Sequence, residues 1–343
     1  MCAVGGYPPL VCCVHAIPAT LRQKGGALPM TITSQHQPIG VFDSGVGGLS
    51  VLRALMAELP DERFVYLADS AYAPYGERGD AYVSARTHAI TQHLLEQHHI
   101  KALVVACNTA TAAAVHEVRS SHPELPLVGL EPAIKTALQA TQTGHVGVIG
   151  TRGTLTSAKF AKLMASLANQ AHFVVQPCDG LAHAIESSVA LPEQPHGAPH
   201  DAAPVGTTET GALCARYIHA MGEFGTESGQ IDTLVLGCTH YIFAEQALRA
   251  LVGPQVRFIE TGEPVARQTR RLLTNANLLN ERAPKNDAPP EHGTQTAPQA
   301  TAVMAPESPR IQLLTTGPVE MLQAAAHRWL GLPAQCCESV SVS

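Results

Sequence analysis

The sequence has no run of lysine and arginine, no C-x-x-C pair and no apolar stretch of membrane-spanning length. Its net charge of −6 and its scattered basic residues argue against nucleic acid or an anionic membrane as a partner. Without C-x-x-C, neither a zinc ribbon nor a thioredoxin-like redox site is expected, and no metal site is predicted. The nine cysteines are an odd number without regular spacing, which argues against a disulfide framework. We therefore expect free thiols in the reducing cytoplasm.

A signal peptide is also not expected from the first residues of the sequence. Residues 8–18 are mildly apolar, but they are too few to cross a membrane and have no positively charged flank. We therefore expect residues 1–37 to be a disordered leader, and Met30 is a candidate for the true start.

Lysine is scarce, and no lysine lies where a predicted strand ends in a polar motif. A cofactor bound as a Schiff base needs a lysine amine in its site. The scarcity therefore argues against such a cofactor. The six lysines are at positions 24, 101, 135, 159, 162 and 285.

Short apolar runs alternate with segments whose apolar residues recur at helical spacing. This alternation predicts βαβ units and parallel sheets covered by helices on both faces. The predicted strands are 38–42, 64–69, 101–106, 125–130 and 310–317, and the clearest predicted helices are 49–59, 81–99, 109–119 and 319–331.

The second half of the chain repeats the pattern of the first. HVGVIGTRGTLTS (145–157) aligns with PIGVFDSGVGGLS (38–50), and TLVLGCTHYIFAEQAL (233–248) resembles LVVACNTATAAAV (103–115). This duplication predicts an α/β fold with two pseudo-symmetric, doubly wound domains, mostly parallel sheets and an active site in the cleft between them. The first domain is predicted from 38–134 plus 243–333 and the second from 135–242, with a loop insertion at 191–210 and a disordered insertion at 281–309.

Polar motifs follow several of the predicted strands, at the sheet edge where open parallel sheets bind ligands. The turn DSGVGG (43–48) matches neither a P-loop nor G-x-G-x-x-G, so it is either a plain turn or a cradle for a small anion. The turn PYGERG (74–79) could line the same edge. The strand-end candidates are Asp43, Ser44, Tyr75, Gly76, Cys107, Asn108, Thr109, Thr151, Cys238, Thr239 and His240.

Cys107 and Cys238 occupy matched positions in the two halves. Facing each other across a cleft, their thiols could remove a proton from one face of a carbon and deliver one to the other face. A helix N-terminus that lowers the pKa of each thiol would favour this role. Two alternatives remain open: a cysteine hydrolase that uses one thiol with His240, and a non-enzymatic protein that binds a small anion.

Five stretches together resemble the glutamate racemases of the cofactor-independent aspartate/glutamate racemase superfamily. The resemblance spans about 39–317 and implies interconversion of L- and D-glutamate without a cofactor, supplying D-glutamate for bacterial peptidoglycan. An aspartate racemase or a decarboxylase-like relative is the nearest alternative. The stretches are GVFDSGVGGLSVL, YLADSAYAPYGERG, VVACNTATA, VGVIGTRGTLTS and VLGCTHY.

The resemblance also implies roles for individual residues and partners for the chain. Cys107 and Cys238 match the two catalytic acid/base cysteines, and Glu186 resembles a glutamate that tunes the second half of the site. Candidate partners are glutamate as substrate, a cell-wall precursor as activator and a second copy of the chain in a homodimer. Substrate-binding or assisting positions are matched by Asp43, Ser44, Tyr75, Gly76, Asn108, Thr109, Thr239 and His240.

Overall fold

The computed structural model describes residues 35–189, 208–280 and 310–343, all within the compact unit Thr33–Ser343. The predicted leader at 1–37 and the insertion at 281–309 lie wholly or almost wholly outside the described residues. The predicted loop at 191–210 also falls mostly outside them, although its last residues already begin a helix at Glu209.

The first sheet has six strands in the order β10-β9-β2-β1-β3-β4, and every neighbouring pair is parallel. Helices α1, α10 and α11 cover one face of it, and α2 and α3 cover the other. Its elements are β1 (Ile39–Asp43), α1 (Leu49–Glu58), β2 (Phe64–Ala68), η1 (Ser70–Tyr72), η2 (Tyr75–Glu77), α2 (Asp80–His98), β3 (Ala102–Val105), α3 (Asn108–Ser121), β4 (Leu127–Gly129), α10 (Gly262–Asn275), β9 (Ile311–Thr315), α11 (Val319–Leu330), η4 (Ala334–Cys336) and β10 (Cys337–Ser339).

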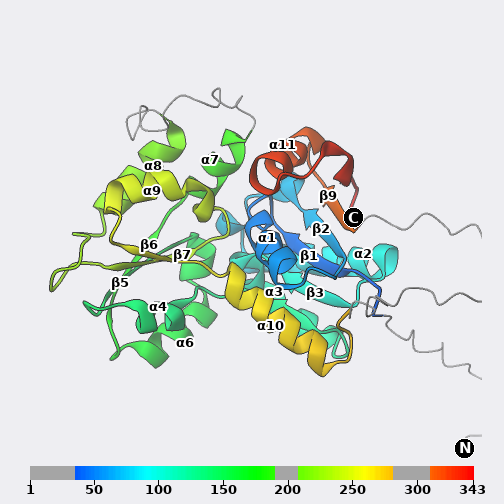
Figure 1. Cartoon of the computed structure of the whole chain (residues 1–343), viewed down its shortest axis with the longest axis horizontal. Coiled ribbons are helices and arrows are strands. Elements are labelled where there is room, and N and C mark those ends of the chain that lie inside the picture. The colour runs from blue at the N-terminus through cyan, green and yellow to red at the C-terminus, as the bar shows by residue number, and fades with distance from the viewer. Residues whose placement is uncertain (1–34, 190–207, 281–309) are drawn as a thin grey trace, which may run out of the picture. The chain divides into compact units, whose positions relative to one another are not determined.

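The second sheet has four parallel strands in the order β6-β5-β7-β8. Helices α7, α8 and α9 pack on one face and α4 and α6 on the other, as Figure 1 shows. Its elements are α4 (Ile134–Ala140), β5 (His145–Gly150), α5 (Arg152–Leu155), α6 (Ala158–Leu167), β6 (His172–Pro177), α7 (Leu181–Ser188), α8 (Glu209–His219), β7 (Thr233–Gly237), η3 (Tyr241–Ala244), α9 (Glu245–Val252) and β8 (Arg257–Ile259).

The two sheets share one strand topology. The order β2-β1-β3-β4 in the first sheet corresponds to β6-β5-β7-β8 in the second, while β9 and β10 extend only the first. This correspondence confirms the predicted pseudo-symmetric α/β fold. It also makes β3 and β7 equivalent strands, and these are the strands that end next to Cys107 and Cys238.

One part of the predicted domain division needs correction. The prediction placed all of 243–333 with the first domain, but β8 pairs with β7 and α9 packs on the second sheet. The reason is that β7, α9 and β8 form one βαβ unit, which brings its second strand back beside the first. The first-sheet part therefore resumes after β8, with α10. The exact domain boundaries stay a prediction.

A buried ion pair secures the first sheet at the end opposite Cys107. Lys101, just before β3, is fully buried, and its Nζ lies 2.5 Å from Oε2 of Glu62. The same Nζ donates to the carbonyl of Leu278 at 2.8 Å, and the amide of Asn280 donates to Glu62 at 2.8 Å. Both charges are thus paired and hydrogen-bonded, as buried charges must be.

Within the part of the chain that the structure describes, no helix combines the length and apolar character that a membrane span requires.

Candidate active site

The carboxyl ends of strands from both sheets border one cavity of about 560 Å³, part of which is open to solvent. Its size is ordinary for a small-molecule site. Every predicted site residue except Glu186 lines the cavity. Glu186 contacts one of the lining residues, His240. The predicted residues that line the cavity are Asp43, Ser44, Tyr75, Gly76, Cys107, Asn108, Thr109, Thr151, Cys238, Thr239 and His240.

Cys107 lies between β3 and α3, as the N-cap residue of the helix. Its Sγ accepts a hydrogen bond from the amide of Ala110 at 3.5 Å and lies 3.8 Å from the hydroxyl oxygen of Ser44. Burial of the thiol, and next the charge of Asp43, raise its pKa, which outweighs the lowering by the helix amide. The expectation of a lowered pKa is therefore wrong for Cys107, because the protein around the side chain shields the thiol from water.

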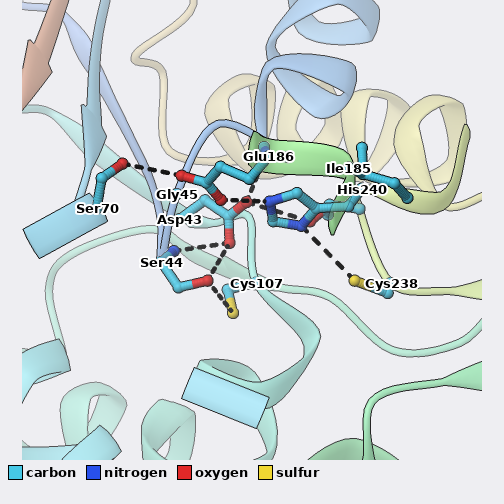
Figure 2. Close-up of polar contacts among 12 residues, drawn as sticks. Asp43, Ser44, Gly45, Ser70, Cys107, Ile185, Glu186, Cys238 and His240 are labelled. Carbon is cyan, nitrogen blue, oxygen red and sulfur yellow. Dashed lines mark hydrogen bonds and ion pairs between the residues drawn. The ribbon is translucent and has the colours of Figure 1, made fainter. Parts of the chain in front are cut away.

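Cys238 belongs to a chain of polar contacts that runs through His240 to Glu186 and on to the hydroxyl of Ser70 (Figure 2). Its Sγ lies 3.7 Å from Nδ1 of His240, and Nε2 of His240 lies 2.8 Å from Oε2 of Glu186. Burial disfavours a charged imidazole, but the contacts with Cys238 and Glu186 outweigh it and raise the pKa of His240 well above its usual value. An imidazolium beside Cys238 is the expected form near neutral pH.

Asp43 is the last residue of β1, and it accepts hydrogen bonds from residues of both halves of the chain. Its carboxylate accepts hydrogen bonds from the amides of Ser44, at 2.7 Å, and Gly48, and from the Thr239 hydroxyl at 3.1 Å. The side chain is fully buried, and this burial raises its pKa despite the opposing charge of His240. Asp43 thus lies close to Cys107 and is tied to the strand end that carries Cys238.

The glycines of the DSGVGG turn allow the first half to approach the His240 cluster. A Cβ atom at Gly45 would lie 2.1 Å from Oε2 of Glu186, and one at Gly47 would lie 2.3 Å from Nδ1 of His240. The buried Tyr66 donates its hydroxyl to the Gly45 carbonyl at 2.6 Å, which holds the turn in place. Gly45 and Gly47 have no side chains, and this leaves room for the contact between His240 and Glu186.

We expect Gly45→Ala to lower the pKa of His240, because the added methyl group would displace the Glu186 carboxylate that stabilises the imidazolium. The fold should persist, since the displaced atoms are the end of a flexible side chain. Histidine NMR titration, with the His240→Gln variant to assign the resonance, measures the shift. Gly79→Ala is the matched control, because a Cβ atom there meets nothing within 4 Å. An unchanged pKa of His240 in Gly45→Ala would contradict this account.

The cavity wall contains an asparagine side chain without a hydrogen-bond partner and threonine hydroxyls that contact each other. The Asn108 side chain is buried at the cavity wall, and neither its amide nitrogen nor its oxygen has a partner among the described residues. Such orphaned groups are costly unless a ligand or water satisfies them. Across the cavity, the hydroxyl oxygens of Thr109 and Thr151 lie 3.0 Å apart, and a Cβ atom at Gly76 would lie 2.7 Å from that of Thr151.

Sequence reasoning missed several residues of the cavity wall. Arg152 and Asp179 form an exposed ion pair, while Cys178 and His183 come from the segment after β6. Arg152 adjoins the predicted Thr151, so its position after a strand could have indicated it. The segment after β6 had no marked polar motif. Among the residues described, no group of three or more His, Cys, Asp or Glu side chains could hold a metal ion.

The comparisons with known proteins agree with this architecture. The profile of the family described as Asp/Glu/Hydantoin racemase matches residues 39–269. A glutamate racemase of Ectopseudomonas mendocina is 47% identical over 72% of this chain and 86% of its own length. One of Pseudomonas aeruginosa is 44% identical over 76% of this chain and 89% of its own.

Solved structures of glutamate racemases are also similar. An isoform from Bacillus anthracis has a TM-score of 0.68 at 28% identity, covering 90% of this chain and 98% of its own. The Escherichia coli enzyme, solved with L-glutamate and the activator UDP-MurNAc-ala, has a TM-score of 0.65 at 26% identity, covering 90% and 99%. The extent of these matches confirms the resemblance seen in the sequence motifs: this chain belongs to the glutamate racemases, isomerases of the Asp/Glu/Hydantoin racemase family.

Proposed function

We propose that this glutamate racemase inverts the α-carbon of glutamate with two bases, Cys107 and Cys238. The observation that carries the proposal is the equivalence of the two cysteines, each following the same strand of a repeated sheet and each bordering one cavity. A substrate held between them would present opposite faces of its α-carbon to the two sulfur atoms.

In each turnover one cysteine thiolate takes the α-proton, and the opposite thiol donates its proton to the other face. The C–H bond breaks, its electron pair stays on the planar carbanion, and a new C–H bond forms from the second sulfur. The two cysteines then exchange protonation states, so their titrations are coupled. The same cycle run backwards converts D- to L-glutamate.

The surroundings of the two sulfur atoms favour one starting state. Burial and the neighbouring Asp43 favour a neutral Cys107 thiol by raising its pKa. The imidazolium of His240, held by Glu186, places a positive charge beside the sulfur atom of Cys238. We infer that Cys107 rests as a neutral thiol.

Charge on the carbanion needs stabilisation, because an α-proton of an amino acid is very weakly acidic. Asn108, with its unpaired amide, and the hydroxyls of Thr109 and Thr239 could hydrogen-bond the α-carboxylate as charge develops there. Ser44, Tyr75, Gly76 and Thr151 form the remaining rim of the proposed substrate site. We propose that these groups carry the reaction without a cofactor.

The cellular role and the partners are part of the same proposal. D-glutamate for peptidoglycan is the proposed purpose, in the cytoplasm, where soluble precursors are made. The complex of the Escherichia coli relative with UDP-MurNAc-ala supports a cell-wall precursor as activator. A homodimer stays a prediction.

Proton NMR of L-glutamate with the purified protein in heavy water tests the function without added cofactor. We expect the α-proton signal to disappear while D-glutamate accumulates, because each inversion delivers a solvent-derived deuteron. L-Aspartate is the parallel substrate, and its faster exchange would indicate an aspartate racemase instead. Unchanged L-glutamate in the presence of folded protein would contradict the proposal.

A further inference from the structure

A buried ion pair lies next to the cavity wall without lining the cavity. Asp69, at the end of β2, is fully buried, and Arg86 of α2 is buried beside it. Arg86 donates from Nε to Oδ2 of Asp69 at 3.0 Å and from Nη2 to Oδ1 at 2.9 Å. This two-point contact fixes both the position and the rotation of the carboxylate.

The same carboxylate holds a residue of the proposed substrate site. The hydroxyl of Tyr75, which lines the cavity, donates to Oδ2 of Asp69 at 2.5 Å. The Thr316 hydroxyl donates to Oδ1 at 3.0 Å. Burial and the charge of Asp69 raise the pKa of Tyr75, so its hydroxyl stays protonated and remains a donor. Each carboxylate oxygen thus accepts two hydrogen bonds.

Arg86 is itself fixed from its other side. Its Nη1 donates to the carbonyl of Val342 at 3.0 Å, and its guanidinium lies 3.5 Å from the centre of the Tyr72 ring. A lysine could supply the charge but could not make the two-point contact, the third hydrogen bond and the ring stacking together. The geometry therefore requires arginine.

We propose that Arg86 is a positioning residue for the racemase: it orients Asp69 so that the hydroxyl of Tyr75 holds the Tyr75–Gly76 turn at the substrate. The proposal rests on the proposed function, in which this turn forms part of the glutamate site. Loss of the contact would let Tyr75 and Gly76 move relative to Thr151, which Gly76 contacts closely. Because the turn binds substrate without exchanging protons, the effect should appear mainly in KM.

The test is steady-state racemisation by Arg86→Lys, Tyr75→Phe and the double variant. We expect Arg86→Lys to raise KM about tenfold with kcat changed less than about threefold. The double variant should then have nearly the KM of the worse single variant, because both substitutions break one chain of contacts. Lys101→Met is the matched control: it breaks the other buried ion pair of this sheet, so it should lower stability to urea without raising KM.

Thr316→Val provides a second route if Arg86→Lys does not fold. It removes the hydrogen bond to Asp69 and the one from the amide of Ala71 while leaving the ion pair intact, and Thr316→Ser, which keeps the hydroxyl, should have the wild-type KM. An unchanged KM in folded Arg86→Lys would overturn the proposal. Where the lysine variant is lost, an unchanged KM in both Tyr75→Phe and Thr316→Val would overturn it, because neither the Tyr75 hydroxyl nor the orientation of Asp69 would then matter for substrate binding. Strictly additive effects of Arg86→Lys and Tyr75→Phe would also overturn it. Full racemisation by a Cys107→Ser or Cys238→Ser enzyme would instead overturn the two-base mechanism. The comparison of KM values would still test whether Arg86 positions the Tyr75–Gly76 turn.

Discussion

Replacing either Cys107 or Cys238 by serine is expected to reduce kcat/KM for glutamate racemisation by about 10³-fold or more. A serine hydroxyl has nearly the size of a thiol but gives up its proton far less readily, so the variant loses one of the two proposed acid/base groups. Since enantiomers have equal free energy, kcat/KM must fall by the same factor in both directions. Polarimetry or a coupled assay for each enantiomer measures the loss.

Two buried cysteines serve as matched controls. Cys178 lines the cavity, but its thiol donates a hydrogen bond to the carbonyl of Gln176, and Cys214 lies in the core of the second sheet. We expect Cys178→Ser and Cys214→Ser to retain racemisation within about tenfold, because neither thiol has a matching partner in the other half. If only one of Cys107 and Cys238 proved necessary, the two-base mechanism would be wrong and a hydrolase with one nucleophile would regain support.

Glu186→Gln is expected to lower kcat/KM by about 10² at pH 8 and to move the alkaline limb of its pH profile to lower pH. The carboxylate of Glu186 stabilises the imidazolium of His240, which lies beside Cys238. Without that charge the pKa of His240 falls, so the imidazolium is lost at a lower pH. Profiles of kcat/KM from pH 6 to 10 for both enzymes measure the shift.

The free energy of unfolding should depend on pH through the same titration of His240. The pKa of His240 is raised by folding, so its contribution to stability is complete below the unfolded value of about 6.5 and disappears as the pH rises through the folded value. The stability advantage of the wild type over Glu186→Gln should therefore shrink with rising pH in this range, as urea unfolding can show.

Glu117→Gln is the control for the removal of a carboxylate. Glu117 also lies near a histidine, His88, at 3.5 Å, but it is exposed and does not line the cavity. Its removal should leave the pH profile unchanged, since exposed pairs interact weakly. An unchanged profile in Glu186→Gln as well would show that Glu186 does not act through His240.

The fold class could be predicted because the signals that carry it are local. Apolar runs such as 103–106 and 233–237 mark buried parallel strands, and the polar residue that ends each run marks the edge where ligands bind. The duplication then predicted two equivalent strand ends, and β3 and β7 are equivalent in the sheet order. The short strand β10 was missed, since CES carries no alternation or apolar run that distinguishes it from a loop.

The sequence identified individual residues of the candidate site, but not the contacts between them. Strand ends identified Cys107, Cys238 and Asp43, because a polar residue after an apolar strand is visible in the sequence. Arg86 was not visible in this way: it lies in the middle of a long helix, where arginine is usually exposed. Its role depends on Asp69, which is close only after α2 has packed against the sheet.

The sequence by itself therefore determined the parallel α/β architecture, its duplication and the pair of strand-end cysteines. The tertiary structure decided how residues distant in the chain combine: Glu186 with His240, Thr239 with Asp43, and β8 with the second sheet. It also showed that burial raises the pKa of Cys107, although the helix N-terminus alone would lower it. The physical reason is the separation of the interacting groups along the sequence. Strand and helix patterns repeat over a few residues, whereas desolvation and hydrogen bonds across the cavity depend on groups that only folding brings together.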